Sequence, residues 1–335
     1  MGRYIVRRLL WLFVVVFFVS LITFSFAHAV PGGPFTSEKK LPAAILVQQE
    51  KYYNLDAPLW RQYVDYIGKI LIPRITTNQS DGSRLEDYLI NIPLGSGYTL
   101  QWMNFGPSYK SQARTVNDIF RENLGVSFEL GIYAFLIATL IGLPLGVLAA
   151  LKQNSLWDYT AMGVAIFGVS VPVIVLGPVF IWLFAVQLRW FLPSGWGSWQ
   201  QNVLPAVALG VGSSAVIARL TRASLLQVVR EDYIRTARAK GLREGIIIVR
   251  HALRNSLIPV VTIMGPIFAY LVTGTIVTET IFGVPGIGRY FVTSITNRDY
   301  PVIMGTALLF AVIIVLANLT VDLLYAWLDP RIRYT

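Results

Sequence analysis

The sequence of 335 residues contains no cysteine and only two histidines, His28 and His251. The absence of cysteine excludes disulfides, zinc–thiolate sites and cysteine nucleophiles. With no H-E-x-x-H motif and so few histidines, neither a metal site nor a histidine-based triad can be assembled within the chain. The P-loop pattern G-x-x-x-x-G-K-S/T is also missing, so we expect this chain to hydrolyse no ATP itself.

Charged residues are scarce as well. They make up 14% of the chain, against about 25% in a soluble domain, while 55% of the residues are hydrophobic. The mean hydropathy is +0.58, which is typical of a polytopic membrane protein. The formal net charge of +10 comes from basic residues that lie beside apolar stretches. A membrane face or an acidic protein partner therefore fits better than nucleic acid.

Six apolar stretches have about the 20 residues needed to cross a bilayer. They are residues 9–29, 127–151, 159–188, 203–220, 257–277 and 302–324. None alternates like the strand of a membrane barrel, so we predict an all-α polytopic membrane protein with six transmembrane helices. The first stretch ends in A-H-A, which resembles a signal-peptidase site, but its length favours an uncleaved anchor over a cleaved signal peptide.

The placement of arginine and lysine predicts the orientation of these spans. Three arginines within the first eight residues predict a cytoplasmic N-terminus, and six spans return the C-terminus to the same side. Loops 152–158 and 222–256 then also lie in the cytoplasm. The second of these holds eight basic and three acidic residues, whereas the short outer loops 189–202 and 278–301 carry little charge by comparison.

This topology divides the chain into four parts. They are an N-terminal anchor helix (1–30), a long extracytoplasmic loop (31–126), a five-helix core (127–328) that includes the cytoplasmic loop 222–256, and a cytoplasmic tail (329–335).

The long outer loop contains "APLWRQYVDYIGKIL", whose spacing predicts an amphipathic helix. Its expected apolar face comprises Leu59, Tyr63, Ile67 and Leu71, with Trp60 and Val64 beside them. We expect this helix to cover the outer ends of the spans; a helix lying in the lipid headgroups is the alternative. Further on, "RITTNQSDGS" (74–83) predicts a polar surface turn.

The cytoplasmic loop predicts two helices joined at a glycine. Residues 221–240 are compatible with a helix, in which Glu231 and Arg235 stand at i,i+4 in the favoured order. Gly241 is placed to end that helix, because glycine accepts the left-handed cap conformation. A second helix is expected from Leu242 into the fifth span.

The second helix is expected to be amphipathic. Its apolar stripe would comprise Ile246, Val249, Leu253 and Leu257, and its basic stripe Arg243, Arg250 and Arg254. Fixing the topology and binding anionic lipid heads would explain the number of arginines. An organised helix–glycine–helix with an apolar stripe favours a surface that docks on another protein.

Few ionisable groups fall within the spans. Glu129 lies near the outer end of the second span and Asp322 late in the sixth, with Asn318 one turn earlier. Such residues are candidates for a transport pathway. Because both acids lie close to a predicted interface, hydrogen bonding or interfacial solvation is the commoner explanation. These observations together indicate a helical membrane subunit that moves something, or helps to, with energy from outside the chain.

The strings "DYIRTARAKGL" and "RHALRNSLIP" resemble the coupling region of permease subunits from the oligopeptide/dipeptide branch of binding-protein-dependent ABC importers. The wider family pattern is E-A-A, three residues, G, nine residues and I-x-L-P, and only Ala237, Gly241 and Leu253 match it here. "RYIVRRLL" with "PGGP", "TETIFGVPGIGRYFVTSITNRDYPV" and "NLTVDLLYAWLDPRIR" are similar to the same branch. A single early span before a long outer loop resembles its first-permease type.

Two features depart from the branch. The outer loop is longer than usual between residues 73 and 102, and "MNFG" stands where a G-D-L-G-like string is common. Gly33 stands where an acidic residue is more frequent.

The resemblance implies a type I ABC importer permease fold with both termini in the cytoplasm and the first span retained. It implies a heterodimer with a second homologous permease, two ATP-binding cassette ATPase subunits and an extracytoplasmic solute-binding protein. The complex would lie in the plasma (inner) membrane of a bacterium or archaeon. No cofactor is expected in this chain, since ATP and Mg would bind to the ATPase subunits.

The resemblance also implies the roles of particular residues. It places the ATPase-coupling interface at Arg235, Thr236, Ala237, Arg238, Ala239, Lys240, Gly241, Leu242, Arg243, His251, Leu253 and Arg254. Glu279, in "TETIFG", is expected to line an outer vestibule or to cap a scoop-like outer loop; a solvated or capping carboxylate is the alternative.

On this reading the chain forms half of a translocation pathway for di- or oligopeptides. Nickel chelates, glycosides or another small solute are alternatives within the same fold. Two other classes stay open: a stand-alone secondary transporter, for which the sequence shows no convincing midplane ion site, and a membrane scaffold that recruits a cytoplasmic partner.

Overall fold

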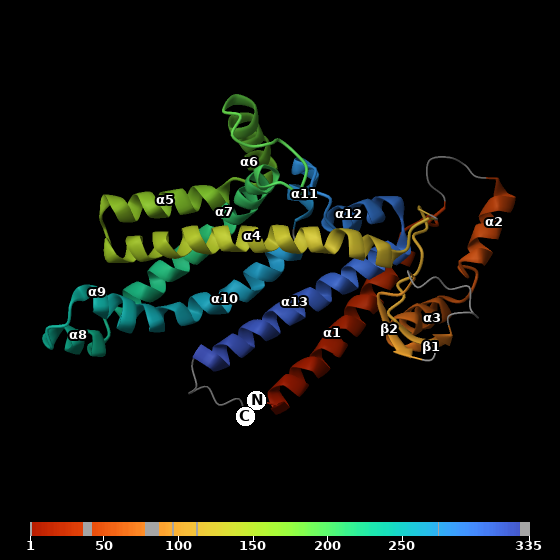
Figure 1. Ribbon diagram of the computed structural model, residues 1–335, viewed down its shortest axis with the longest axis horizontal. Helices are drawn as coiled ribbons and strands as arrows, with labels where there is room; N and C mark the ends of the chain where they lie inside the picture. Colours follow the sequence, from red (N-terminus) through yellow and green to blue (C-terminus); the bar gives the residue numbers. More distant parts are fainter. Residues whose placement is uncertain are drawn as a thin grey trace. The chain divides into compact units, whose positions relative to one another are not determined.

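The computed structural model describes residues 2–35, 42–77, 87–95, 97–111, 113–273 and 275–328. The chain divides into two compact units. Unit 1 comprises Met1–Leu9, Ser127–Pro285 and Ile313–Thr335, and unit 2 comprises Leu10–Val126 and Gly286–Val312. Each unit is described by itself below, with the element labels of Figure 1.

The described residues of unit 1 form helices and the turns and loops between them, without a strand. It contains most of α4 (Val116–Leu151), then α5 (Leu156–Ser170), α6 (Val173–Phe180), the π-helix η2 (Ile181–Gln187), α7 (Trp199–Val228), α8 (Asp232–Ala239), α9 (Glu244–Ile246), the π-helix η3 (Ile247–Ala252), α10 (Leu253–Thr273), α11 (Ile276–Phe282) and the second part of α13 (Tyr300–Leu328).

Five helices of the described chain are long and apolar enough to cross a membrane. They are Val6–Ala29, Val116–Leu151, Trp199–Val228, Glu244–Thr273 and Tyr300–Thr320. They correspond to five of the six predicted spans, and the predicted helical fold class is confirmed. Counting the bent pair α5 and α6 as one further span gives six.

The predicted span over 159–188 is a broken one, made of α5 and of α6 with η2. The chain bends by 103° between α5 and α6 (Figure 1). Pro172 precedes α6 and has no N–H to continue the helical ladder. The residue before a proline is also driven toward extended backbone, and Val171 has ψ 114°. The sequence therefore breaks this span at one dipeptide.

Small residues let the helices of unit 1 approach closely. A Cβ on Gly142 of α4 would lie 2.6 Å from the carbonyl oxygen of Ser214 on α7, and one on Gly146 would lie 2.5 Å from that of Ala218. The two glycines are one turn apart, so they form a flat strip along α4. Such strips replace a hydrophobic driving force between membrane helices with tight van der Waals packing.

Unit 2 combines helices with a small sheet. Its elements are the greater part of α1 (Gly2–Ala29), α2 (Ala43–Tyr52), α3 (Leu59–Leu71), β1 (Arg74–Thr77), β2 (Ile90–Gly95), β3 (Tyr98–Trp102), the start of α4, α12 (Gly288–Asn297) and the start of α13.

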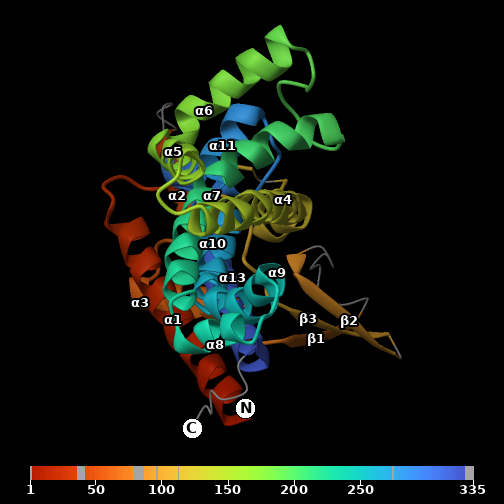
Figure 2. The ribbon, with the colours of Figure 1, turned by 90° about the vertical axis from the view of Figure 1, so that its left-hand side faces the viewer.

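The sheet of unit 2 was not predicted. Its strands are antiparallel in the order β1-β3-β2, with Thr76 opposite Thr99 and Asn91 opposite Gln101 (Figure 2). The segment expected to be a polar turn thus begins as strand β1, and its residues 78–83 lie outside the described chain. Isoleucine and threonine in R-I-T-T favour a strand, but the polar residues that follow them obscured this signal.

The amphipathic helix of the outer loop forms as α3, and its predicted apolar face is covered only in part: Tyr63 and Ile67 are half-buried. Leu59 and Val64 are each 56% exposed, whereas Ile70 is buried in the core of unit 2 with Tyr66 packed against it. Apolar residues surround much of this helix, so spacing alone did not fix which side is covered. The same core includes Phe120 and Val302, which bring the starts of α4 and α13 together.

Candidate coupling region

The cytoplasmic loop begins with a sharp turn that the sequence did not predict. α7 ends at Val228 and α8 begins at Asp232, so the expected continuous helix over 221–240 is wrong. Glu231 has extended backbone (φ −67°, ψ 148°) and precedes α8. The expected pair of Glu231 with Arg235 is therefore not formed. Arg235 instead lies 3.7 Å from Asp232, and because both side chains are highly exposed this contact adds little stability.

Gly241 ends α8, as predicted. Its φ of +73° is left-handed, which glycine adopts without a Cβ penalty. The N–H of Gly241 donates to the carbonyl of Arg238 (2.9 Å), and the N–H of Leu242 donates to that of Ala237 (3.4 Å). This pair of bonds is a Schellman motif, which satisfies the last carbonyls of the helix.

The inner side of α8 packs on its own chain. Ile234 and Ala237, three residues apart, are buried in a cluster with Leu225 of α7, Ile247 and Ala252. Ala237, a predicted coupling residue, therefore holds α8 against unit 1. Its side chain is turned away from the exposed surface of the helix.

The outer side of α8 carries most of the remaining predicted coupling residues. Arg235, Thr236, Arg238, Ala239 and Lys240 are exposed, and so are Gly241, Leu242 and Arg243 in the turn that follows. The exposed surface is thus continuous from α8 through the glycine turn.

Two side-chain contacts fix the angle between α8 and the next helix. The guanidinium of Arg238 contacts the carboxylate of Glu244 through Nε–Oε1 (2.7 Å) and Nη2–Oε2 (3.4 Å), across the Gly241 turn. The side-chain amide of Asn255 donates to the hydroxyl of Tyr233 (2.8 Å). α8 is therefore tied at both ends to the helix that leads into α10.

The predicted apolar stripe of the second helix is wrong at its start. Ile246 is 45% exposed and Val249 is 68% exposed, whereas Ile247 and Ala252 are fully buried. Residues 247–252 form a π-helix, whose wider turn changes which positions share a face. The expected basic residues Arg250 and Arg254 are exposed as predicted, and Leu253 and His251 are half-buried.

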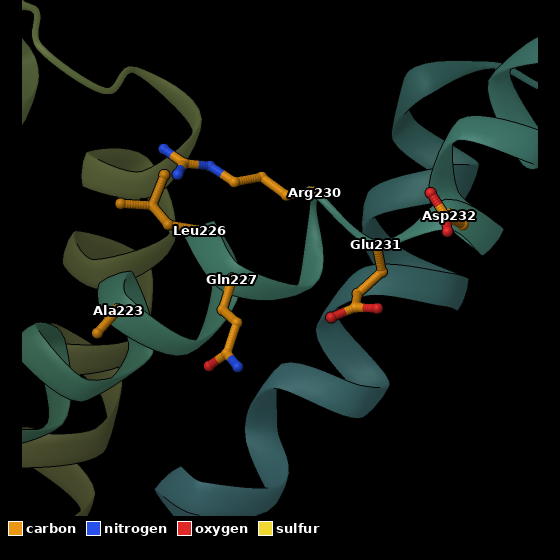
Figure 3. A pocket seen from close by; sticks show the side chains of 6 residues that line it. All are labelled: Ala223, Leu226, Gln227, Arg230, Glu231 and Asp232. Carbon is orange, nitrogen blue, oxygen red and sulfur yellow. The ribbon is translucent and has the colours of Figure 1, made fainter.

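A hollow of about 570 Å³ lies at the turn between α7 and α8. Its lining residues are Ala223, Leu226, Gln227, Arg230, Glu231 and Asp232. Figure 3 shows the side chains of Gln227 and Glu231 projecting to the same side of this turn. Sequence reasoning missed this hollow because it depends on the break between the two helices.

A buried ion pair lies next to the coupling region and was also missed. Arg222, in the last turns of α7, donates from Nε to Oδ1 and from Nη2 to Oδ2 of Asp158, both at 2.7 Å. Oδ2 of Asp158 also accepts from the backbone N–H of Asn154 (3.0 Å). Asp158 is 2% exposed. The pair joins the first turn of α5 to α7, and its 64-residue separation leaves no local sequence signal.

The predicted pathway residues occupy different environments in unit 1. Glu279 on α11 is 1% exposed and accepts hydrogen bonds from the hydroxyls of Ser127 (2.6 Å) and Thr275 (2.5 Å). Its carboxylate thus joins α11 to α4 in the packed interior. This arrangement differs from the solvated carboxylate that the sequence left open.

Glu129 is half-buried on α4. Its carboxylate accepts from the hydroxyl of Tyr133 (2.5 Å) and from the indole N–H of Trp196 (3.3 Å). Asn318 on α13 is half-buried, and the side chain of Asp322 lies outside the described part of the structure. Hydrogen bonding, rather than an open pathway, accounts for the observed contacts of both glutamates.

The fold and this region define a class of protein: a multi-pass helical membrane protein with a helix–glycine–helix attached to one of its spans. Residues 142–334 match the family described as "Binding-protein-dependent transport system inner membrane component", and residues 1–84 match the N-terminal model of such components. The chain belongs to this family. It is a permease subunit of an ABC importer, without catalysis of its own.

Similar proteins cover the whole chain. It is 42% identical over 333 residues to the "Dipeptide transport system permease protein DppB" of Bacillus subtilis, covering 99% of this chain and 98% of that relative. It is 41% identical over 336 residues to the "Oligopeptide transport system permease protein OppB" of Salmonella typhimurium, with both chains covered completely.

Solved structures with a similar fold are more distant in sequence. An inward-facing form of the MetNI methionine ABC transporter has a TM-score of 0.52 at 21% identity, covering 63% of this chain and 96% of that one. An amino acid ABC transporter has a TM-score of 0.51 at 18% identity, covering 63% and 94%. These similarities support the type I importer permease fold.

Proposed function

We propose that this chain imports di- or oligopeptides as one of two related permeases in a heterodimer. Identity above 40% over the full length to permeases named for dipeptides and oligopeptides supports this substrate class. Nickel chelates, glycosides and other small solutes are the alternatives within the fold. The delivering solute-binding protein is expected to choose the substrate, and the peptide assignment rests on the similarity of the permease.

The proposed energy source is a pair of ATPase subunits, which hold ATP and Mg, on the cytoplasmic side of a bacterial inner membrane. Both termini of this chain and loop 222–256 face the same side. The single observation that carries this proposal is α8 with its glycine turn. It is a short exposed helix that contacts α9 through Arg238–Glu244 and α10 through Tyr233–Asn255, and that packs on its own chain through Ile234 and Ala237.

In the proposed mechanism the exposed side of α8 and the Gly241 turn dock on one ATPase subunit. Closure of the ATPase pair then moves α8, and the buried contacts of Ile234 and Ala237 pass this movement to α7. The spans alternate between inward-open and outward-open states, as rigid bodies moved by a two-state element.

The proposed division of the coupling residues follows their exposure. Arg235, Thr236, Lys240 and Leu242 contact the ATPase, with Ala239 and Arg243 at the edge of the contact. Ala237 packs inward, Gly241 gives the bend and Arg238 holds it. His251, Leu253 and Arg254 belong to the helix that receives the movement.

We propose that the two glutamates among the predicted pathway residues hold helices and loops in position. Glu279 holds α11 to α4 through Ser127, at the outer end of the span. Glu129, with Tyr133 and Trp196, fixes the loop before α7. Asn318 and Asp322, both on α13, are retained as candidate pathway residues.

The experiment is purification of the chain from its own membranes in mild detergent, with identification of the co-purifying proteins and an ATPase assay. We expect a second permease, P-loop ATPases and peptide-stimulated activity once the solute-binding protein is added. A chain that purifies alone from several detergents, with no ATPase, would favour a stand-alone carrier or a scaffold. ATPase activity that is stimulated by nickel chelates or glycosides but not by peptides would reject peptides as the substrate class.

A further inference from the structure

Arg250 and Arg254 are one turn apart on the continuous helix Glu244–Thr273, and both are exposed. Within the described part of the chain, neither guanidinium has a hydrogen bond or an ion pair. This distinguishes them from Arg235 and Arg238, whose charges contact Asp and Glu. No acidic residue follows Glu244 on this helix, so nothing on it neutralises the two arginines.

The length of the helix places these arginines at a particular depth. Its 30 residues span about 45 Å at a rise of 1.5 Å per residue, whereas the hydrocarbon core is about 30 Å thick. We take Thr273, the last residue of the helix, as the outer edge of the hydrocarbon core. The inner edge, about 20 residues back along the helix, then lies beside Arg254. Arg250 lies about 6 Å further out, within a headgroup layer of about 5–8 Å on each side of the core.

A tilted helix gives the same assignment. Tilting draws both residues toward the hydrocarbon, and long arginine side chains then extend to the headgroups. α8 packs beside this helix, and its Tyr233 accepts a hydrogen bond from Asn255, so the arginine pair and the ATPase-facing surface are neighbours that the experiment has to distinguish.

We propose that Arg250 and Arg254 bind the phosphate of an anionic phospholipid in the cytoplasmic leaflet. This assignment rests on the proposed function for the side of the membrane. Arginine is suited to the role because its guanidinium donates several hydrogen bonds to phosphate oxygens. In the proposed mechanism α8 and this helix move together, and the bound lipid keeps the inner end of the helix at the membrane surface during that movement.

The test is a titration of the purified complex in detergent with dioleoylphosphatidylglycerol, followed by native mass spectrometry. Neutral phosphatidylcholine is titrated in parallel. The double variant Arg250→Gln/Arg254→Gln is expected to bind phosphatidylglycerol about 30-fold more weakly, from about 1 kcal/mol for each basic residue. Arg250→Lys/Arg254→Lys is expected to retain most of the affinity, since it keeps the charge.

A matched control removes two other exposed cations. Lys51→Gln/Arg61→Gln, on α2 and α3 of unit 2, is expected to bind phosphatidylglycerol like the unchanged protein. Unchanged binding in Arg250→Gln/Arg254→Gln would overturn the proposal. Loss of the ATPase subunits from that variant, with lipid affinity unchanged, would assign the arginines to the ATPase contact and would also overturn it.

The titration does not depend on which side of a membrane the loop faces, because it is made in detergent. Failure of the proposed orientation would be detected separately, by labelling a cysteine introduced at Lys240 from outside intact cells. If the double variant loses lipid binding and Lys240→Cys is labelled from outside intact cells, the two arginines still form the lipid site. Its assignment to the cytoplasmic leaflet is then wrong. That result would overturn the proposal as stated.

Discussion

At the residue scale, the ion pair of Asp158 with Arg222 is the polar contact whose removal is expected to cost most. Arg222→Met leaves a carboxylate that is 2% exposed without its main partner, and uncompensated buried charges cost about 3–5 kcal/mol. We expect about 3 kcal/mol here, because Arg222 itself is partly exposed. The measurement is the midpoint of thermal unfolding of the purified complex.

The matched control is Arg219→Met, one turn earlier on α7. Arg219 is exposed and has no ion pair within the described residues, so its loss is expected to leave the midpoint nearly unchanged. Asp158→Asn is expected to be intermediate, since the amide keeps one acceptor for Arg222. Equal midpoints for Arg222→Met and Arg219→Met would show that the buried pair does not stabilise the fold.

Gly142 on α4 gives a second residue-scale prediction. A Cβ there would lie 2.6 Å from a carbonyl oxygen of α7, which cannot move as a flexible side chain would. Gly142→Ala is therefore expected to destabilise the complex by about 1–3 kcal/mol, as overpacking does. Gly163→Ala on α5 is the control, because no atom lies within 4 Å of its Cβ position. A thermal midpoint lowered equally by both variants would contradict the close α4–α7 contact.

At the element scale, the Gly241 turn fixes the direction in which α8 leaves the bundle. Gly241→Ala meets no neighbouring atom but must adopt φ +73°, which costs about 1–2 kcal/mol for a residue with a Cβ. We expect the turn to change, and uptake of peptide per ATP hydrolysed to fall while the subunit stays in the membrane. Gly245→Ala, exposed and without a left-handed φ, is expected to keep the wild-type ratio.

Gly241→Pro tests the same turn more severely. Proline cannot adopt a positive φ and removes the N–H that donates to Arg238. Uptake is expected to be abolished, with the subunit still present in the membrane fraction. Normal uptake in this variant would contradict the assignment of α8 as the coupling helix.

The elements that the sequence predicted correctly are those whose signal is long or locally unambiguous. Five apolar stretches became five helices able to span a membrane, and Gly241 ended its helix because a left-handed cap is a local requirement. The predictions that were wrong depend on contacts between distant residues or on a change of helical period. The π-helix after Ile246 moved Val249 to the surface, and the Asp158–Arg222 contact joins residues 64 positions apart.

At the scale of the whole molecule, orientation in the membrane decides whether α8 can meet an ATPase. The positive-inside rule places the loop with its excess of arginine and lysine in the cytoplasm. Because the chain contains no cysteine, one introduced thiol reports one position without background. Lys240, beside the Gly241 turn, and Lys51 on α2 are both exposed and therefore suitable positions.

We expect a membrane-impermeant maleimide to label Lys51→Cys in intact cells. Lys240→Cys is expected to react only after the membrane is permeabilised, since the two residues lie in segments predicted for opposite sides. Labelling after full denaturation measures the amount of each variant present, and peptide uptake identifies variants that remain assembled. Reaction of Lys240→Cys in intact, transport-competent cells would place α8 outside. The ATPase-coupling function would then have to be assigned to another part of the chain.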